Sequence, residues 1–100
     1  MYGYSMRIAE PIDRYLALHQ AIMEIAGDIE GLILHYAHPT PGGFVITEIW
    51  QGKEQLDAFN GNVMPQVLQS SGVTLGEAPP ELTEFDPVVV VTPGAFNSDL

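Results

Sequence analysis

The sequence predicts a single α+β domain in which helices cover one face of a four-stranded antiparallel sheet. Two patterns lead to this prediction. Short segments rich in strand-forming residues predict strands, and longer segments with apolar residues at spacings of three and four predict helices. Along the chain these segments follow the order strand, helix, strand, strand, helix, strand. A chain of 100 residues is long enough for one core of two packed layers, so residues 1–100 are expected to form one domain.

The first strand and the first helix are predicted from two different periods. Over residues 4–9, large apolar side chains alternate with smaller or polar ones, which is typical of a strand. From Pro11 to Ala26, apolar residues recur along one stripe of a helix. This stripe consists of Ile12, Tyr15, Leu18, Ile22 and Ile25. Pro11 suits the first turn, and Gly27 suits the left-handed position after the helix ends.

Residues 44–50, with the sequence Phe-Val-Ile-Thr-Glu-Ile-Trp, are predicted to form the central strand. Their β-branched and aromatic side chains fit a pleated surface, and both faces are mainly apolar. Residues 31–38 form a second predicted strand that is also apolar on both faces. A strand with one wet face alternates apolar and polar residues, so both faces of this sheet are expected to be covered.

These two strands are expected to form a hairpin, because the residues between them are Pro, Thr, Pro, Gly and Gly. If the connection spans residues 39–42, His35 pairs with Ile46 and lies diagonal to Glu48 on the same face. A slip of one residue would separate His35 from Glu48, because successive strand residues point to opposite faces.

The second half of the chain is predicted to complete the same plan. A helical region follows the central strand, and Gly61-Asn62 divides it into two short helices, with Pro65 in the first turn of the second. Residues 72–84 are expected to form a long exposed connection and are the best candidate for a lid. The last strand is predicted over residues 85–92, and residues 93–100 are expected to be a flexible tail.

The order of these elements is the ferredoxin-like βαββαβ plan, which places both helical regions on one face of the sheet. The other face then leaves large apolar groups in water, at a cost of roughly 25 cal/mol per Å². A second copy packed sheet to sheet, with a buried area on the order of 1,600 Å² or more, would remove this cost. We therefore expect a homodimer.

Composition limits which partners the protein is expected to bind and where in the cell it is expected to be. Thirteen acidic residues against three basic ones give a net charge of −10, and the simplest role of this charge is to keep an apolar protein soluble. Nucleic acids and anionic membranes attract clustered Lys and Arg, so neither is an expected partner. The absence of cysteine excludes disulfides and thiolate chemistry. The sequence contains no recognisable signal peptide or membrane-spanning run, so a cytoplasmic location is expected.

His35 and Glu48 are the candidate catalytic residues. A carboxylate beside an imidazole in an apolar pocket can fix the tautomer of the imidazole and make it a stronger base. The alternative is a satisfied buried pair with a structural role. The side chains that can line a pocket for a flat aromatic ligand are Trp50, Tyr36, Tyr15, His19 and Phe59, although such aromatics also fit a plain core. No spacing of His, Asp and Glu supports a metal site, so none is expected.

Several short segments resemble a known family. These are Leu34-His35-Tyr36-Ala37, Gly42-Gly43-Phe44, Glu48-Ile49-Trp50, the helix start near Lys53-Glu54, and Met64-Pro65. Over roughly residues 5 to 92 the chain resembles the dimeric α/β barrel proteins related to antibiotic biosynthesis monooxygenases, in particular their small actinobacterial members. The resemblance implies a homodimer whose two sheets form a barrel, with a pocket in each subunit between sheet and helices.

The resemblance also implies a choice of functions. Some proteins of this kind oxidise quinols or polyketide-like aromatics without a cofactor, and some degrade haem. The haem-degrading branch has a histidine ligand in the second helical region, whereas residues 51–71 contain no histidine and Phe59 stands about where that branch has a tryptophan. Haem degradation is therefore not expected. The resemblance favours a cofactor-independent monooxygenase, or a cyclase, acting on a small aromatic, quinol or polyketide-type substrate.

Two functions of other classes remain open from the sequence. One is a non-catalytic dimeric module that binds a small hydrophobic molecule. The other is an assembly protein whose pocket is filled by its own side chains.

Overall fold

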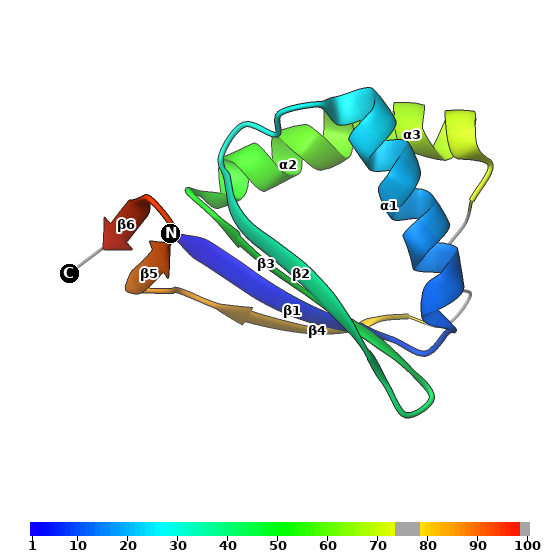
Figure 1. Cartoon of the computed structure of the whole chain (residues 1–100), viewed down its shortest axis with the longest axis horizontal. Coiled ribbons are helices and arrows are strands. Elements are labelled where there is room, and N and C mark those ends of the chain that lie inside the picture. The colour runs from blue at the N-terminus through cyan, green and yellow to red at the C-terminus, as the bar shows by residue number, and fades with distance from the viewer. Residues whose placement is uncertain (74–78, 99–100) are drawn as a thin grey trace.

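The computed structural model describes residues 1–73 and 79–98 (Figure 1). A four-stranded antiparallel sheet in the order β2-β3-β1-β4 forms one layer. Its strands are β1 (Tyr2–Ile8), β2 (Leu32–Thr40), β3 (Gly43–Trp50) and β4 (Glu81–Phe85). The second layer consists of the helices α1 (Ile12–Ala26), α2 (Lys53–Asn62) and α3 (Met64–Ser71), which lie on one face of the sheet. The predicted ferredoxin-like plan is confirmed.

The hairpin between β2 and β3 is tighter than predicted. Thr40 pairs with Gly43, so only Pro41 and Gly42 lie between the strands, and Gly42 has a φ of 76°. A proline followed by a glycine with positive φ is typical of a type II turn. Strand β2 continues through Pro39, which an edge strand tolerates because one side of its ladder has no partner strand.

This turn changes the predicted register. His35 pairs directly with Glu48, and the predicted pairing of His35 with Ile46 was wrong by two residues. A shift of two residues keeps every side chain on its predicted face, because strand side chains alternate with period 2. The expected neighbourhood of His35 and Glu48 is therefore present, and it is closer than predicted.

The helices follow the sequence signals closely. Helix α1 starts directly after Pro11 and ends at Gly27, which has a φ of 58°, and it buries Tyr15 and Leu18 against the sheet. The second helical region is divided in two as predicted, although the division falls at Val63 rather than at residues 61–62. Pro65 lies in the first turn of α3, where its missing N–H has no helical partner to lose.

The C-terminal quarter of the chain differs from the prediction. The fourth strand of the sheet is β4, which lies within the segment predicted as a connection, and its five residues are exposed at the sheet edge. The valine-rich segment instead forms β5 (Val89–Thr92), which pairs with β6 (Ala95–Ser98) in a separate two-stranded sheet. This small sheet lies near the N-terminus of the chain, where β1 begins (Figure 1).

Two further predictions concern the same region. Within the segment predicted as a flexible tail, Ala95–Ser98 form β6 after a turn at Gly94, which has a φ of 81°. β-branched residues favour a strand but do not select its partner, so the pattern indicated β structure without locating it. The predicted lid falls partly on residues 74–78, which lie outside the described residues.

The core lies between the sheet and the helices. It contains two clusters of buried apolar side chains. The first consists of Ile8, Tyr15, Phe44 and Ile46, and the second of Tyr4, Trp50 and Leu56. Among the described residues, no helix combines the length and the apolar character needed to cross a lipid bilayer.

Candidate functional site

Five side chains on the helix-covered face form a connected hydrogen-bond network around Glu48. The Glu48 network consists of Tyr4, Tyr15, His35, Glu48 and Trp50. His35 Nδ1 lies 2.5 Å from Glu48 Oε2, and the Tyr15 hydroxyl lies 2.5 Å from His35 Nε2. The other carboxylate oxygen, Oε1, accepts hydrogen bonds from the Tyr4 hydroxyl and from Trp50 Nε1, the latter at 3.1 Å.

The register of the sheet aligns three members of this network in one row. Tyr4 on β1 pairs with Glu48 on β3, and Glu48 pairs with His35 on β2. Directly opposed residues on neighbouring strands have close Cβ atoms on the same face, so their side chains meet without distortion. Tyr15 is added from α1, where it belongs to the apolar stripe that faces the sheet. The network thus connects three strands and one helix.

The Glu48 carboxylate is held in its ionised form. Burial alone would raise the pKa of Glu48, but the hydrogen bonds from His35, Tyr4 and Trp50 together lower it below the ordinary value of 4.5. A carboxylate that accepts several hydrogen bonds is favoured in its charged form. Glu48 therefore carries a negative charge at neutral pH in a mainly apolar environment.

The two tyrosines remain protonated and act as hydrogen-bond donors. Burial and the nearby charge of Glu48 raise the pKa of Tyr15 to about 12, and the same two causes raise the pKa of Tyr4 further. Since ionised Glu48 can only accept, His35 Nδ1 carries a proton, and in the neutral form of the ring Nε2 accepts a hydrogen bond from Tyr15. The network thus fixes the tautomer of His35 and leaves Nε2 as its basic atom.

The Glu48 network lines an inner cavity of about 430 Å³ between the sheet and the helices. Tyr4, Tyr15, His35 and Glu48 reach this cavity, and much of the remaining wall is apolar. The apolar lining includes Leu18, Ile22, Ile46 and Leu56. This volume is within the range of small-molecule sites, about 300–1,000 Å³, and a few convergent polar groups in an apolar wall are typical of such sites.

A small cavity of about 120 Å³ adjoins the same residues and brings in most of the remaining predicted side chains. His19 lines it, and its ring stacks on that of His35 with 5.7 Å between centroids. Trp50 and Phe59 also line it, and their ring centroids are 5.8 Å apart. Four of the five predicted binding residues, Trp50, Tyr15, His19 and Phe59, therefore lie around His35 and Glu48.

Tyr36 is not part of this site. It pairs with Thr47 on the opposite face of the sheet, and 47% of it is exposed. Because His35 and Tyr36 are consecutive in β2, they point to opposite faces, so they cannot line one pocket. Alternation along the strand was sufficient to make this distinction from sequence.

Tyr4 is the functional candidate that sequence reasoning missed. It was predicted on a strand with its side chain beside Met6 and Ile8, but without a polar partner. The ferredoxin-like plan itself places the first strand beside the third, so a tyrosine opposite a strand carboxylate was an available signal.

Comparison with known proteins depends on structure, since the sequence alone finds no relative. No family model matches this chain, and no curated protein matches it at a significant level. Three solved structures of similar fold are a candidate antibiotic biosynthesis monooxygenase from Chloroflexus aurantiacus, the protein Rv0793 from Mycobacterium tuberculosis and the heme-degrader MhuD from Mycobacterium tuberculosis with two hemes in its active site.

These similarities extend over almost the whole of each chain. The Chloroflexus protein has 19% identity and a TM-score of 0.65 over 93% of this chain and 98% of its own. Rv0793 has 16% identity and a TM-score of 0.64 over 91% and 98%. MhuD has 17% identity and a TM-score of 0.56 over 92% and 100%.

The chain has the fold of antibiotic biosynthesis monooxygenase-like proteins. The predicted resemblance is thereby confirmed at the level of fold, and identities this low carry no residue roles from one protein to another.

A haem does not fit the residues around the cavities of this monooxygenase-like fold. His35 has both ring nitrogens hydrogen-bonded, and His19 lines a cavity of about 120 Å³, well below the usual size of a ligand site. Among the residues that the structure describes, no three His, Asp or Glu side chains converge as metal ligands.

Proposed function

We propose that this protein is a cofactor-independent monooxygenase that acts on a small phenol or quinol. The observation that carries the proposal is the hydrogen-bonded series Tyr15, His35 and Glu48 on the wall of the inner cavity. A neutral imidazole with a fixed tautomer, backed by a carboxylate, is the arrangement that general-base catalysis requires. The similarity of fold to monooxygenase-like proteins is consistent with this reaction class.

Removal of the phenolic proton is assigned to Tyr15 and His35 acting together. A substrate hydroxyl in the inner cavity donates to the Tyr15 oxygen, and Tyr15 passes its own proton to His35 Nε2, which it already contacts at 2.5 Å. Glu48 then stabilises the imidazolium through Nδ1. Tyr15 need not ionise in isolation, since its proton leaves as the substrate proton arrives.

The substrate anion is the reductant for molecular oxygen. Its negative charge is delocalised onto a ring carbon that carries hydrogen. That carbon bonds to oxygen to give a peroxide anion, which takes the proton back from the His35 imidazolium through Tyr15 and becomes a hydroperoxide. Loss of water then leaves a quinone, so one oxygen atom ends in the new carbonyl group and the other in water. The apolar side chains of the wall, among them Leu18, Ile22 and Ile46, provide contact surface for the aromatic ring of the substrate.

Oxygen uptake with a panel of hydroxynaphthoquinols tests the proposal. His35→Ala is expected to reduce the enzymatic rate by about 100-fold or more, which is the usual contribution of a general base. Tyr15→Phe keeps the ring and removes the hydroxyl, and it is expected to lower the rate while substrate still binds. Tyr36→Phe is the control, because its side chain is on the other face. Identical uptake by wild type and His35→Ala would remove His35 from the mechanism.

A non-catalytic binding protein is the second candidate. It is favoured by the saturation of both His35 nitrogens, which a purely structural pair would also display. Native mass spectrometry that detects a co-purified hydrophobic molecule, with no oxygen uptake for any quinol, would support this candidate over the enzyme.

We also propose that two chains form a homodimer through the sheet face that the helices leave open. Tyr36 and Phe85 are 47% and 38% exposed on this face, and Val45 and Ile49 are half-buried there. A stable interface would cover on the order of 1,600 Å² in total. Sedimentation velocity is expected to give a dimer for wild type and a monomer for Tyr36→Glu. The matched control is Leu16→Glu on the exposed side of α1, which should remain dimeric. A monomeric wild type would contradict this proposal.

A further inference from the structure

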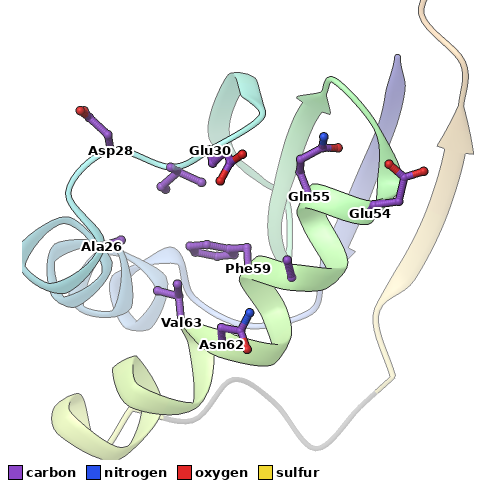
Figure 2. A pocket seen from close by; sticks show the side chains of 10 residues that line it. Ala26, Asp28, Glu30, Glu54, Gln55, Phe59, Asn62 and Val63 are labelled. Carbon is purple, nitrogen blue, oxygen red and sulfur yellow. The ribbon is translucent and has the colours of Figure 1, made fainter.

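A third cavity, of about 350 Å³, lies outside the site described above (Figure 2). This outer cavity is bounded by the end of α1, the loop that leads to β2, and one side of α2. Its lining includes Asp28, Ile29, Glu30, Glu54, Phe59 and Asn62. The outer cavity is thus comparable in size to the inner one, and it is large enough to hold a substantial part of a small molecule.

Phe59 separates the outer cavity from the reactive side chains. Its side chain lines the outer, the inner and the small cavity. Figure 2 shows the ring reaching from α2 toward the loop that carries Asp28 and Glu30. On its other side the ring packs at a tilt of 45° against Trp50, whose indole nitrogen is bonded to Glu48. Phe59 is the one lining residue that the outer and inner cavities have in common, and Ile29 joins it between the outer and the small cavity.

We propose that Phe59 is a specificity-determining residue that sets how long a ligand the inner cavity accepts. A ligand with an aromatic head beside His35 and a flexible tail passes Phe59 and places the tail in the outer cavity. A smaller side chain at position 59 widens this passage, and a larger one narrows it. The aromatic head rests on the proposed function, whereas the partition itself rests on the positions of the cavities.

The outer cavity also selects the chemistry of the tail. Among the described residues that line it, the titratable side chains are the carboxylates of Asp28, Glu30 and Glu54. The net charge of the whole chain, −10, has the same sign. A tail that ends in an ammonium group is attracted by these charges, and a tail that ends in a carboxylate is repelled. Because these three carboxylates are exposed and therefore screened, they favour an amine tail over a carboxylate tail without fixing the rest of the ligand.

Binding calorimetry with three probes tests this inference without any turnover. The probes are 2-naphthol, 2-naphthol with an aminohexyl chain and 2-naphthol with a carboxypentyl chain. Phe59→Leu is expected to raise the affinity for the aminohexyl probe about tenfold relative to 2-naphthol, which corresponds to the burial of about two further methylene groups. Phe59→Trp is expected to lower the same ratio about tenfold. The carboxypentyl probe should bind more weakly than the aminohexyl probe in every variant.

Leu56→Val is the matched control. Leu56 lies one turn earlier on α2 and lines the inner cavity, but it does not line the outer one. This variant should change the affinities for all three probes by the same factor. Both Phe59 variants keep a large apolar side chain, and their thermal midpoints establish that they are folded before they are compared.

The outcomes separate this inference from the proposed function. An affinity ratio between long and short probes that is unchanged by Phe59→Leu and Phe59→Trp would overturn the partition, even if oxygen uptake is observed. The expected change in ratio without oxygen uptake would support the partition and contradict the monooxygenase proposal. Failure of every variant to bind any probe would overturn the inference.

Discussion

The two faces of the sheet differ most clearly in two adjacent rows of residues. Tyr4, Glu48 and His35 form a row on the covered face, and Ser5, Thr47 and Tyr36 form the next row on the open face. The rows use the same three strands and are one residue apart. On the open face, the Ser5 and Thr47 hydroxyls are hydrogen-bonded at 2.9 Å, and Tyr36 is exposed.

This difference teaches that strand residues hold the charge of the covered row, because the three donors to Glu48 lie on β1, β2 and β3. The helices contribute the burial of this face. Helix α1 contributes Tyr15, whose hydroxyl bonds to His35 and not directly to Glu48. In a low-dielectric environment such bonds are stronger, and the cost of losing one is greater. In the open row Thr47 is also buried, at 7% exposure, but its hydrogen bond with Ser5 joins two neutral hydroxyls.

The largest effect should come from a cavity on the covered face. Phe44 is fully buried, and Phe44→Ala is expected to lower the free energy of unfolding by about 3–5 kcal/mol. Tyr36→Ala on the open face should lower it by less than about 0.5 kcal/mol at protein concentrations dilute enough to keep the chain monomeric. Urea denaturation measures both variants. Equal losses would mean that the two faces are equally covered.

The next effect concerns the buried charge and depends on pH. The pKa of Glu48 is lower in the folded chain than its ordinary value of 4.5, so the unfolded chain binds more protons in the acid range. The resulting stability is fully present above about pH 4.5 and is lost as the pH falls through the lower, folded-state pKa. Glu48→Gln is expected to lower the free energy of unfolding at neutral pH by about 1–3 kcal/mol.

Urea midpoints measured from about pH 6 down to about pH 3 check the pH dependence. The wild type should lose more stability over this interval than Glu48→Gln does. A variant with the same acid dependence as the wild type would show that other carboxylates cause it.

A smaller effect is expected from Tyr4→Phe. This substitution keeps the ring and removes one donor to Glu48, at a cost of about 0.5–1.5 kcal/mol, and it moves the acid loss of stability to higher pH. Tyr2→Phe is the matched control, because the Tyr2 hydroxyl donates to Glu84 in an exposed position, at 3.1 Å. If both variants behave alike in acid denaturation, the Tyr4 contact does not hold the Glu48 charge.

The smallest effect is expected on the open row. Thr47→Val has nearly the same shape and removes the hydrogen bond with Ser5, and it should cost about 1 kcal/mol or less without any dependence on pH. Thermal denaturation at two pH values measures both properties. A loss of stability that depends on pH would contradict this prediction, because it would mean that Thr47 influences the charge of Glu48 on the other face.

The part of the fold predicted from sequence is the part with local signals. Strands β1 to β3 and the three helices follow from period, proline and glycine, since these act within a few residues of the chain. The C-terminal quarter was predicted less well, because which of its strands joins the main sheet depends on pairing with β1, a strand distant in the sequence. The valine-rich β5 is more hydrophobic than β4, yet β4 completes the sheet.

For the candidate site, too, the sequence indicated the local features and missed the contacts between distant residues. Alternation placed His35 and Glu48 on one face, and the same rule excludes Tyr36 from it. The hydrogen bond of Tyr15 to His35 and that of Tyr4 to Glu48 join residues 20 and 44 positions apart in the chain, respectively. No local pattern encodes such contacts.

The sequence by itself therefore determined the α+β plan, the face on which the residues of β1 to β3 lie and the presence of a histidine and a carboxylate on the same face. Only the tertiary structure decided that β4 rather than β5 is the fourth strand, that Tyr15 and Tyr4 complete the Glu48 network, and that Phe59 stands between two cavities. The reason is physical. Periodicity is set by backbone geometry within one element, whereas partners, cavities and pKa shifts arise from the packing of elements that are distant in the chain.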